Sequence, residues 1–240
     1  MGDALVDLPL FPLQTVLFPG GLLPLQIFEV RYLDMIGRCH KEKQPFGVVS
    51  LTQGREVRQP KRGQPADPAH ASPPLSSAST PPQARSEFLP EGFHAIGTLA
   101  HIDLLERPQP GLMRIRCSGG QRFKLKSSEQ LKHGLWMGTA ELMADDAEVP
   151  VPDDLSHARR AMKQVIEQLK AQVEDDTQMP LQLPYRWDDC CWLSNRWSEL
   201  LPVSTQIKQQ FMSLDNPLVR LELVADLLDQ MKFSNPADEG

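Results

Sequence analysis

Apolar residues recur in two different rhythms along the chain, and the rhythm changes near residue 145. Before that point they form short runs separated by turn-forming residues, which is typical of β-strands. The runs are Leu8–Leu13, Leu23–Phe28, Phe46–Leu51, Ile96–Leu105 and Leu135–Met143, together with Met113–Cys117 and Arg122–Lys126, which alternate with period two. Such a series of short strands predicts a barrel or a sandwich.

The stretch LFPGGLLPLQIFE, residues 17–29, combines strand-like apolar runs with prolines and glycines. A proline has no N–H for a sheet ladder, so the two proline-containing strands around this stretch are predicted to lie at edges or bulges. Gly20 and Gly21 are predicted to supply a tight reversal between them. A short amphipathic helix is predicted over residues 29–39, because apolar residues recur there with a helical period. Its predicted buried face holds Val30, Leu33, Met35 and Ile36.

After residue 150 the apolar residues recur every three or four positions, which indicates amphipathic helices. The first predicted helix runs to Val173, and the second ends at Leu201. Each predicted start carries a side chain that can accept hydrogen bonds from the first backbone N–H groups, and the last start also places a proline in the first turn. The predicted starts are Asp153 or Asp154, Asp188–Asp189, Ser204 and Asn216–Pro217. Together the helices predict a small bundle.

The predicted organisation has a β-rich pseudo-barrel subdomain over residues 1–145, a helical subdomain over 150–233 and a tail over 234–240. A proline-rich segment, residues 59–90, interrupts the first subdomain. It holds few large apolar residues and cannot bury enough surface to offset its ordering entropy, so we predict a flexible, dispensable insertion. A proline-rich ligand for SH3-type domains is the alternative for this segment.

A hairpin is predicted between the two alternating runs. The apolar residues of both runs share one face only if the loop has an odd length, so the predicted loop is Gly119-Gly120-Gln121. The opposite, outward face would carry five basic residues, Arg114, Arg116, Arg122, Lys124 and Lys126. Opposed like charges are unfavourable, so this face is predicted to attract carboxylates from the acidic helical part or from a partner. Phosphate contacts and a plain solvated face are the alternatives.

Charge is unevenly divided along the chain. The formal net charge is −6, but residues 1–144 carry 16 Lys and Arg against 13 Asp and Glu, whereas residues 145–240 carry 9 against 18. The negative total argues against a nucleic-acid partner. No run approaches the roughly 18 apolar residues of a membrane span. No basic residue precedes Arg31, so no signal peptide is expected, and the expected location is the cytoplasm.

Residues that carry chemistry do not form a recognisable catalytic or metal-binding motif. The four cysteines lack metal-ligand spacing, and no two of the six histidines form an H-x-x-x-H pair, so neither a metal nor a cofactor is predicted. The sequence also contains no G-x-x-x-x-G-K-[ST] phosphate loop and no G-x-S-x-G nucleophile elbow. No catalytic residue is therefore predicted.

The stretch LPLFPLQTVLFPGGLLPLQIFEVRYLDMI, Leu8–Ile36, resembles the opening of the N-terminal, substrate-binding domain of Lon proteases. The likeness continues in IGTLAHI from Ile96, in GGQRFKL from Gly119 and in the stretch Glu199–Leu228. It covers most of the chain outside residues 59–90 and corresponds to a stand-alone member without ATPase or peptidase domains. The resemblance implies an α+β fold, in which a PUA-like pseudo-barrel with a short helix is followed by helices.

The resemblance also implies a non-catalytic module that binds unfolded or partly folded polypeptide. It would be an adaptor in protein turnover, with a protease or a chaperone as a further partner. A PUA-like nucleic-acid-binding protein and an uncharacterised enzyme are the alternatives. The candidate binding residues are Glu29, Arg31 and Tyr32, the clustered aromatics Trp187 and Trp192, and the basic residues Arg114, Arg116 and Lys124. A local contact at a helix start and a place in the core are the structural alternatives for the first two groups.

Overall fold

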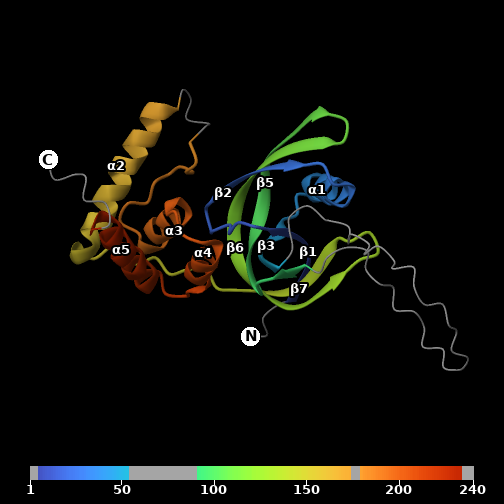
Figure 1. Cartoon of the computed structure of the whole chain (residues 1–240). Coiled ribbons are helices and arrows are strands. Elements are labelled where there is room, and N and C mark those ends of the chain that lie inside the picture. Colours follow the sequence, from blue (N-terminus) through green and yellow to red (C-terminus); the bar gives the residue numbers. More distant parts are fainter. Residues whose placement is uncertain (1–4, 54–90, 174–178, 234–240) are drawn as a thin grey trace, which may run out of the picture.

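The strands lie in the first part of the chain and most helices in the second (Figure 1). The structure is a computed structural model that describes residues 5–53, 91–173 and 179–233. The strands are β1 Leu5–Leu13, β2 Leu22–Ile27, β3 Phe46–Gln53, β4 Gly92–Phe93, β5 Ile96–Gln109, β6 Leu112–Gln130 and β7 Trp136–Leu142. The helices are α1 Val30–Glu42, α2 Ser156–Gln172, α3 Cys190–Leu200, α4 Thr205–Ser213 and α5 Pro217–Phe233, with a 3-10 turn η1 at Asp153–Leu155. The predicted α+β class is confirmed, whereas the predicted insertion (59–90) and tail (234–240) lie outside the described residues.

Five strands close into a ring. β1 pairs with β7, β7 with β6, β6 with β5 and β5 with β3, all antiparallel, and β3 returns to β1 as a parallel neighbour. β6 has 19 residues and pairs with β2 through its first part and with β7 through its second. The described strand β2 therefore lies outside the ring and pairs with β6 alone.

Prolines occupy stretches in which a strand pairs on one side. Pro9 lies in the part of β1 that pairs with β7, Pro12 lies in the part that pairs with β3, and Leu10 pairs with both. Pro24 lies in β2. A missing N–H costs no ladder bond where it points away from the single partner. The prediction of an edge strand is therefore confirmed for β2, and in β1 the same rule holds within each half of the strand.

Residues 18–21 form the predicted tight reversal before β2. The N–H of Gly21 donates to the carbonyl of Phe18 at 2.9 Å, and Gly20 has a φ of +70°. A proline in the second position and a positive φ in the third are features of a type II turn, which glycine adopts without strain. The N–H of Gly20 also donates to the carbonyl of Gly119 at 2.7 Å, so the turn is joined to β6.

The predicted hairpin at Gly119–Gln121 is wrong, because these residues lie inside β6. The register with β5 shifts by one residue between Gly119 and Arg122, which marks a β-bulge. A Cβ at Gly119 would lie 2.1 Å from the carbonyl oxygen of Phe18, so this glycine permits a close backbone approach rather than a turn. The actual reversal between β5 and β6 contains Gly111, with a φ of +78°.

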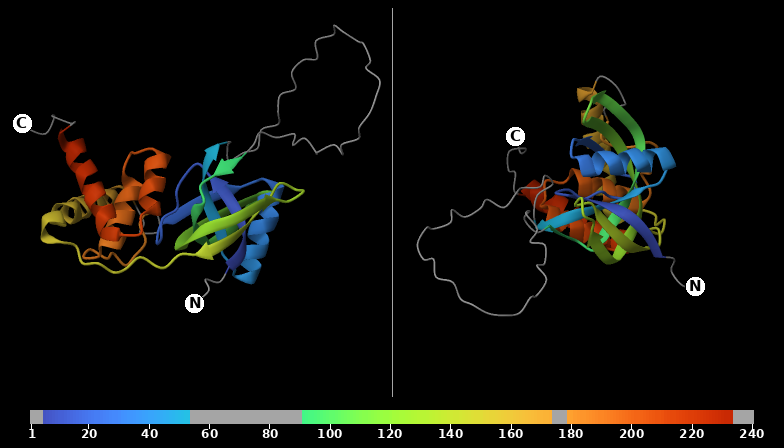
Figure 2. Two further views of the ribbon diagram at one scale, coloured as in Figure 1. Left: turned by 90° about the horizontal axis from the view of Figure 1, so that it is seen from below. Right: turned by 90° about the vertical axis from the view of Figure 1, so that its right-hand side faces the viewer.

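The strands lie between α1 on one side and the helices α2–α5 on the other (Figures 1 and 2). Neighbouring residues of β3 pack in two different apolar clusters, since successive side chains of a strand point to opposite faces. Val48 packs in the cluster that includes α1, and Val49 packs with Phe123 of β6. A third cluster fills the helical part and includes Val16 and Phe18 from the β1–β2 connection. This connection therefore joins the strands to the helical core.

Helix starts follow the predicted capping with one exception. The side chain of Asp189 accepts from the N–H groups of the first turn of α3, that of Ser204 accepts at the start of α4, and that of Asn216 accepts at the start of α5. Asp153 and Asp154 do not cap α2, because they form the 3-10 turn that precedes it.

Candidate functional site

The eight predicted binding residues lie in three separate places. Glu29, Arg31 and Tyr32 lie at the start of α1, Trp187 and Trp192 lie in the helical part, and Arg114, Arg116 and Lys124 lie along β6. The structure therefore brings together the members of each group but does not join the groups into one site.

Arg31 is buried and holds α1 in place. Its Nη1 donates to the carbonyl of Gly134, between β6 and β7, at 2.7 Å, and its Nε donates to the carboxylate of Glu29 at 3.0 Å. The guanidinium carbon lies 4.4 Å from the centroid of the Tyr32 ring. These contacts lie within the chain, so Arg31 positions its neighbours and is not itself open to a ligand.

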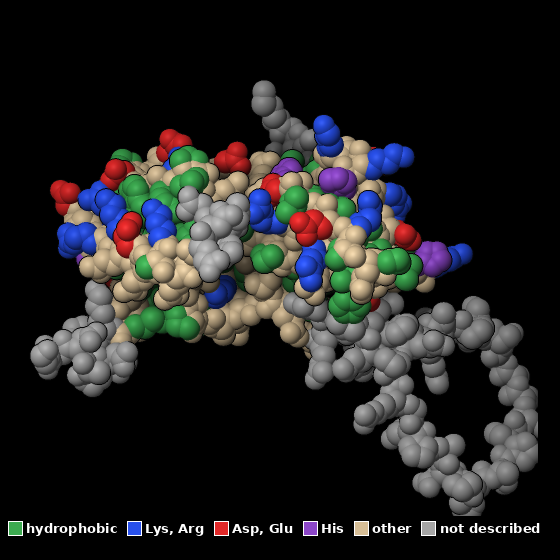
Figure 3. Space-filling model, turned by 90° about the horizontal axis from the view of Figure 1, so that it is seen from above, with side chains coloured by type: hydrophobic (Ala, Val, Ile, Leu, Met, Phe, Trp, Pro, Cys, Tyr) green, Lys and Arg blue, Asp and Glu red, His purple; other side chains and the backbone are tan. Residues whose placement is uncertain are grey.

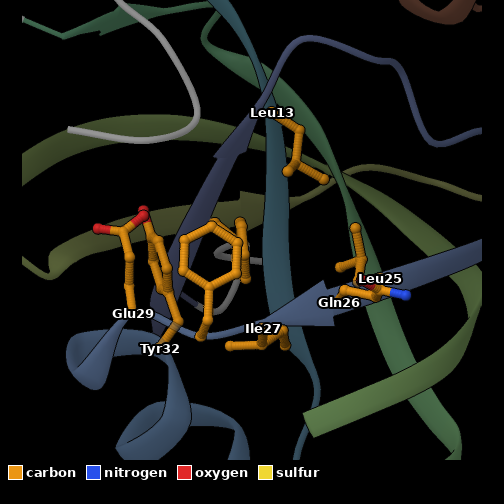
Figure 4. A pocket seen from close by; sticks show the side chains of 8 residues that line it. Leu13, Leu25, Gln26, Ile27, Glu29 and Tyr32 are labelled. Atoms are coloured by element: carbon orange, nitrogen blue, oxygen red, sulfur yellow. The ribbon is translucent and has the colours of Figure 1, made fainter. Parts of the chain in front are cut away.

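An apolar pocket of about 70 Å³ lies between the end of β1 and β2 (Figure 4). Its lining residues are Phe11, Leu13, Leu25, Gln26, Ile27, Phe28, Glu29 and Tyr32. Tyr32 is stacked on Phe11, with ring centroids 4.0 Å apart and planes inclined by 12°. Five consecutive residues of the chain, 25–29, line the pocket, so it borders the edge of β2 and not one face of it. This pocket together with the neighbouring Val30 is called the β2 groove below.

Two large apolar side chains stand exposed at the β2 groove. Phe28 exposes 56% of its surface and Val30 exposes 72%. The prediction that Val30 lies on the buried face of α1 is wrong, because the buried stripe contains Tyr32, Met35 and Ile36, and Val30 lies about 200° around the helix from Tyr32. Alternation along β2, with Pro24 and Gln26 exposed, would have placed Phe28 outward as well.

The predicted aromatic residues form a cluster with Tyr185. The ring centroids of Trp187 and Trp192 are 5.4 Å apart, and those of Tyr185 and Trp187 are 5.2 Å apart. Two lysines of α2 cover outer ring faces, with Lys163 lying 5.3 Å from the Trp187 centroid and Lys170 lying 5.5 Å from that of Tyr185. Trp192 is buried in the helical core. The cluster thus joins the α2–α3 connection to α2.

The basic residues of β6 do not form the predicted outward face. Arg114 is exposed and lies opposite Glu106 of β5, so a carboxylate-bearing residue and not a lysine is its cross-strand neighbour. Lys126 forms an ion pair with Glu141 of β7, and Lys124 is exposed. On the face shown in Figure 3, basic side chains are interspersed with acidic and apolar ones over both halves of the molecule.

Arg122 contradicts the outward prediction most clearly, because it is buried against the helical part. Its guanidinium donates to the carboxylate of Asp146 at 2.6 Å and to the carbonyls of Met212 and Leu214 at 2.9 and 3.0 Å. Asp146 also accepts from Arg220 at 2.7 Å. This buried network joins β6 to the helices and to the segment that leads into them.

The thiols do not form a reactive centre. Burial raises the pKa of Cys117 and Cys191 to about 12 and that of Cys190 to about 11, and it also raises the pKa of Cys39. The thiolate, which is the nucleophile and the metal ligand, is therefore disfavoured. Among the described residues, no group of three or more His, Cys, Asp or Glu side chains could hold a metal ion. None of the described helices has the length and apolar character to span a membrane.

The comparisons with a family model and with solved structures point to the same family. The model of the ATP-dependent protease La (LON) substrate-binding domain matches residues 7–230. A Lon N-terminal domain protein from Xanthomonas campestris is similar in structure, with a TM-score of 0.63, 23% sequence identity and coverage of 91% of this chain and 96% of that chain. The N-terminal domain of the Mycobacterium avium complex Lon protease has a TM-score of 0.54 and 12% identity, with coverage of 92% and 97%. No curated protein matches the chain.

Proposed function

The chain belongs to the Lon substrate-binding domain family, and from this membership we propose that it binds unfolded or partly folded polypeptides through the β2 groove. The observation that carries the proposal is the pair of exposed apolar side chains, Phe28 and Val30, beside an apolar pocket. Exposed apolar patches on a folded domain mark interaction sites. Segments of an unfolded polypeptide present apolar side chains that such a site can shield from water.

The other predicted residues support this choice of surface. Arg31 is buried and donates to the carbonyl of Gly134, and Tyr32 is stacked on Phe11 at the groove. The aromatic cluster is covered by lysines of its own domain. Arg122 forms a buried ion pair with Asp146, so it is not available to contact a phosphate. This argues against a row of phosphate-binding residues along β6 and therefore against nucleic-acid binding.

Binding of a labelled, permanently unfolded polypeptide tests the proposal. The double variant Phe28→Ser with Val30→Thr should weaken binding by about 30-fold, because two buried apolar contacts are each worth roughly 1 kcal/mol. The matched control is Leu223→Ser, since Leu223 is also exposed, at 42%, but lies in α5. Fluorescence anisotropy measures the affinity, and circular dichroism confirms that each variant is folded. Equal affinity of the double variant and the wild-type protein would refute the β2 groove as the binding site.

We further propose that the bound polypeptide is passed to a protease or a chaperone, which makes the chain an adaptor without catalysis of its own. The support is membership of a family of substrate-binding domains. Affinity capture from a cell extract, with and without nuclease, tests this role. Capture of a protease or chaperone that survives nuclease supports it, and loss of all partners on nuclease treatment favours nucleic-acid binding instead.

A further inference from the structure

β2 offers an edge that no described strand covers. Its six residues pair antiparallel with β6, from Leu22 opposite Ser118 to Ile27 opposite Met113. On the same side of β6, β7 begins to pair only at Phe123, beyond the bulge. The β2 groove borders the uncovered edge, since residues 25–29 line it in sequence. Edge strands with this geometry are templates for an added strand.

The chain already uses this edge once. Leu181, in the connection between α2 and α3, forms an antiparallel bridge with Gly21, the residue directly before β2. One residue of another part of the chain therefore already pairs directly before the start of β2. From this bridge, the uncovered edge of β2 runs toward the groove.

Backbone parity shows which groups face the open edge. In an antiparallel strand, the N–H and C=O of one residue point to one side and those of the next residue point to the other. The carbonyl of Gly21 accepts from the N–H of Gly119 in β6 at 2.8 Å, so the odd-numbered residues direct their groups toward β6. Pro24 and Gln26 then direct theirs to the open edge, which agrees with the absence of an N–H at Pro24. Leu22 lies beside the bridge between Gly21 and Leu181, so the free part of the edge presents the carbonyls of Pro24 and Gln26 and the N–H of Gln26.

We propose that a polypeptide client binds in extended conformation as an additional strand along β2, with one side chain in the pocket and the next apolar residue against Phe28. The inference rests on the proposed function and specifies how the β2 groove recognises its client. The pocket, at about 70 Å³, has room for a side chain and not for a second chain. Main-chain hydrogen bonds then supply affinity and alternate side chains supply preference. Such a site tolerates many sequences but excludes folded and helical segments, whose backbone groups are already paired.

N-methylated peptides test the backbone contact. A short peptide that alternates valine with threonine and lysine is compared with two versions that carry N-methyl groups on alternate residues, one version for each parity. Strand addition predicts that one version binds about 30-fold more weakly, because two hydrogen bonds of about 1 kcal/mol each are lost. The other version should bind like the parent, because its methyl groups point away from β2. Equal binding by both versions and the parent would overturn the inference.

A matched pair of variants on the protein gives an independent readout. Gln26→Pro removes the N–H that faces the open edge, at a position equivalent to Pro24. Gln26→Ala removes the same pocket-lining side chain but keeps the N–H, so it serves as the reference. Gln26→Pro should bind the parent peptide about fivefold more weakly than Gln26→Ala, which corresponds to the loss of one hydrogen bond. If Gln26→Pro binds as tightly as Gln26→Ala while the Phe28 and Val30 variant binds weakly, the groove binds side chains only, so the inference fails and the proposed function stands. If the Phe28 and Val30 variant also binds normally, both fail.

Discussion

Nη2 of Arg196, in α3, donates a 2.7 Å hydrogen bond to the carbonyl of Pro19, in the turn that leads into β2. The same guanidinium donates to the carbonyl of Gly20 and pairs with the carboxylate of Glu199 at 3.0 Å. Arg196 is 1% exposed. One buried side chain of the helical part therefore fixes the turn from which the edge strand of the β2 groove starts.

Arg196→Ala should lower the free energy of unfolding by about 3 kcal/mol or more, because truncation leaves two carbonyls and a carboxylate without their buried donor. Arg196→Lys should recover only part of the loss, because an ammonium cannot reproduce the planar fork of donors. Urea denaturation measures both. The control is Arg186→Ala, since Arg186 pairs with Glu148 at the surface and should cost less than about 1 kcal/mol. Equal losses for Arg196 and Arg186 would contradict the role assigned to Arg196.

Two glycine-to-alanine substitutions should have opposite effects. Gly119→Ala should destabilise the protein by about 3 kcal/mol, because its Cβ would collide with the carbonyl oxygen of Phe18, which is backbone and cannot rotate away. Gly37→Ala should stabilise it by about 1 kcal/mol, because Gly37 lies within α1 with no neighbour within 4 Å of a new Cβ, and alanine is the better helix former. The melting temperature of each variant, compared with that of the wild-type protein, shows whether the substitution stabilises or destabilises the fold. A stable Gly119→Ala protein would show that the close approach at the bulge is not required.

Local pattern was sufficient for much of the fold. The caps at Asp189 and Ser204 were predictable because a short polar side chain before a helical period satisfies its own first turn. Pro24 identified an edge strand because its missing N–H is a property of one residue. These signals depend on neighbours in sequence, so no knowledge of the fold was needed.

The β2 groove could not be predicted in the same way. It depends on Phe11 meeting Tyr32 and on which strand is missing beside β2, and both follow from long-range pairing. The turn predicted at Gly119 is absent, because a Gly-Gly pair favours a turn unless another backbone, here that of Phe18, approaches it. Arg122 was predicted to attract carboxylates from the acidic part of the chain, and it pairs with Asp146 and Asp215, but nothing near it in the sequence shows that it is buried.

Glu199 should make stability fall as pH rises. Burial raises the pKa of its carboxyl from 4.5 to about 7, against the opposite effects of Arg196 and Lys208. The folded state then binds a proton that the unfolded state releases, so this contribution is complete below pH 4.5 and is lost as pH rises toward 7. The contribution is at most about 3 kcal/mol.

Glu199→Gln isolates that contribution, because glutamine resembles the protonated carboxyl and does not titrate. The free energy of unfolding, measured by urea denaturation at several pH values, should favour the variant over the wild-type protein increasingly between pH 5 and 8. Other carboxylates affect both proteins alike and cancel in the difference. A difference that stays constant, or that shrinks with rising pH, would show that Glu199 is ionised in the folded protein throughout this range.

Asp146 and Asp215 both accept from Nη2 of Arg122, at 2.6 and 3.3 Å, but their side chains are 3% and 81% exposed. Asp146 also accepts from Arg220, so Asp146→Asn would leave Arg220 without its compensating charge and Arg122 with only the exposed carboxylate of Asp215. This change should lower the free energy of unfolding by about 3 kcal/mol or more. Asp215→Asn, which removes a solvent-screened charge from the same arginine, should cost less than about 1 kcal/mol. The two variants have the same chemistry and differ in burial. Equal losses in urea denaturation would mean that pairing with Arg122, and not burial of Asp146 between two arginines, determines how strongly β6 is joined to the helical part.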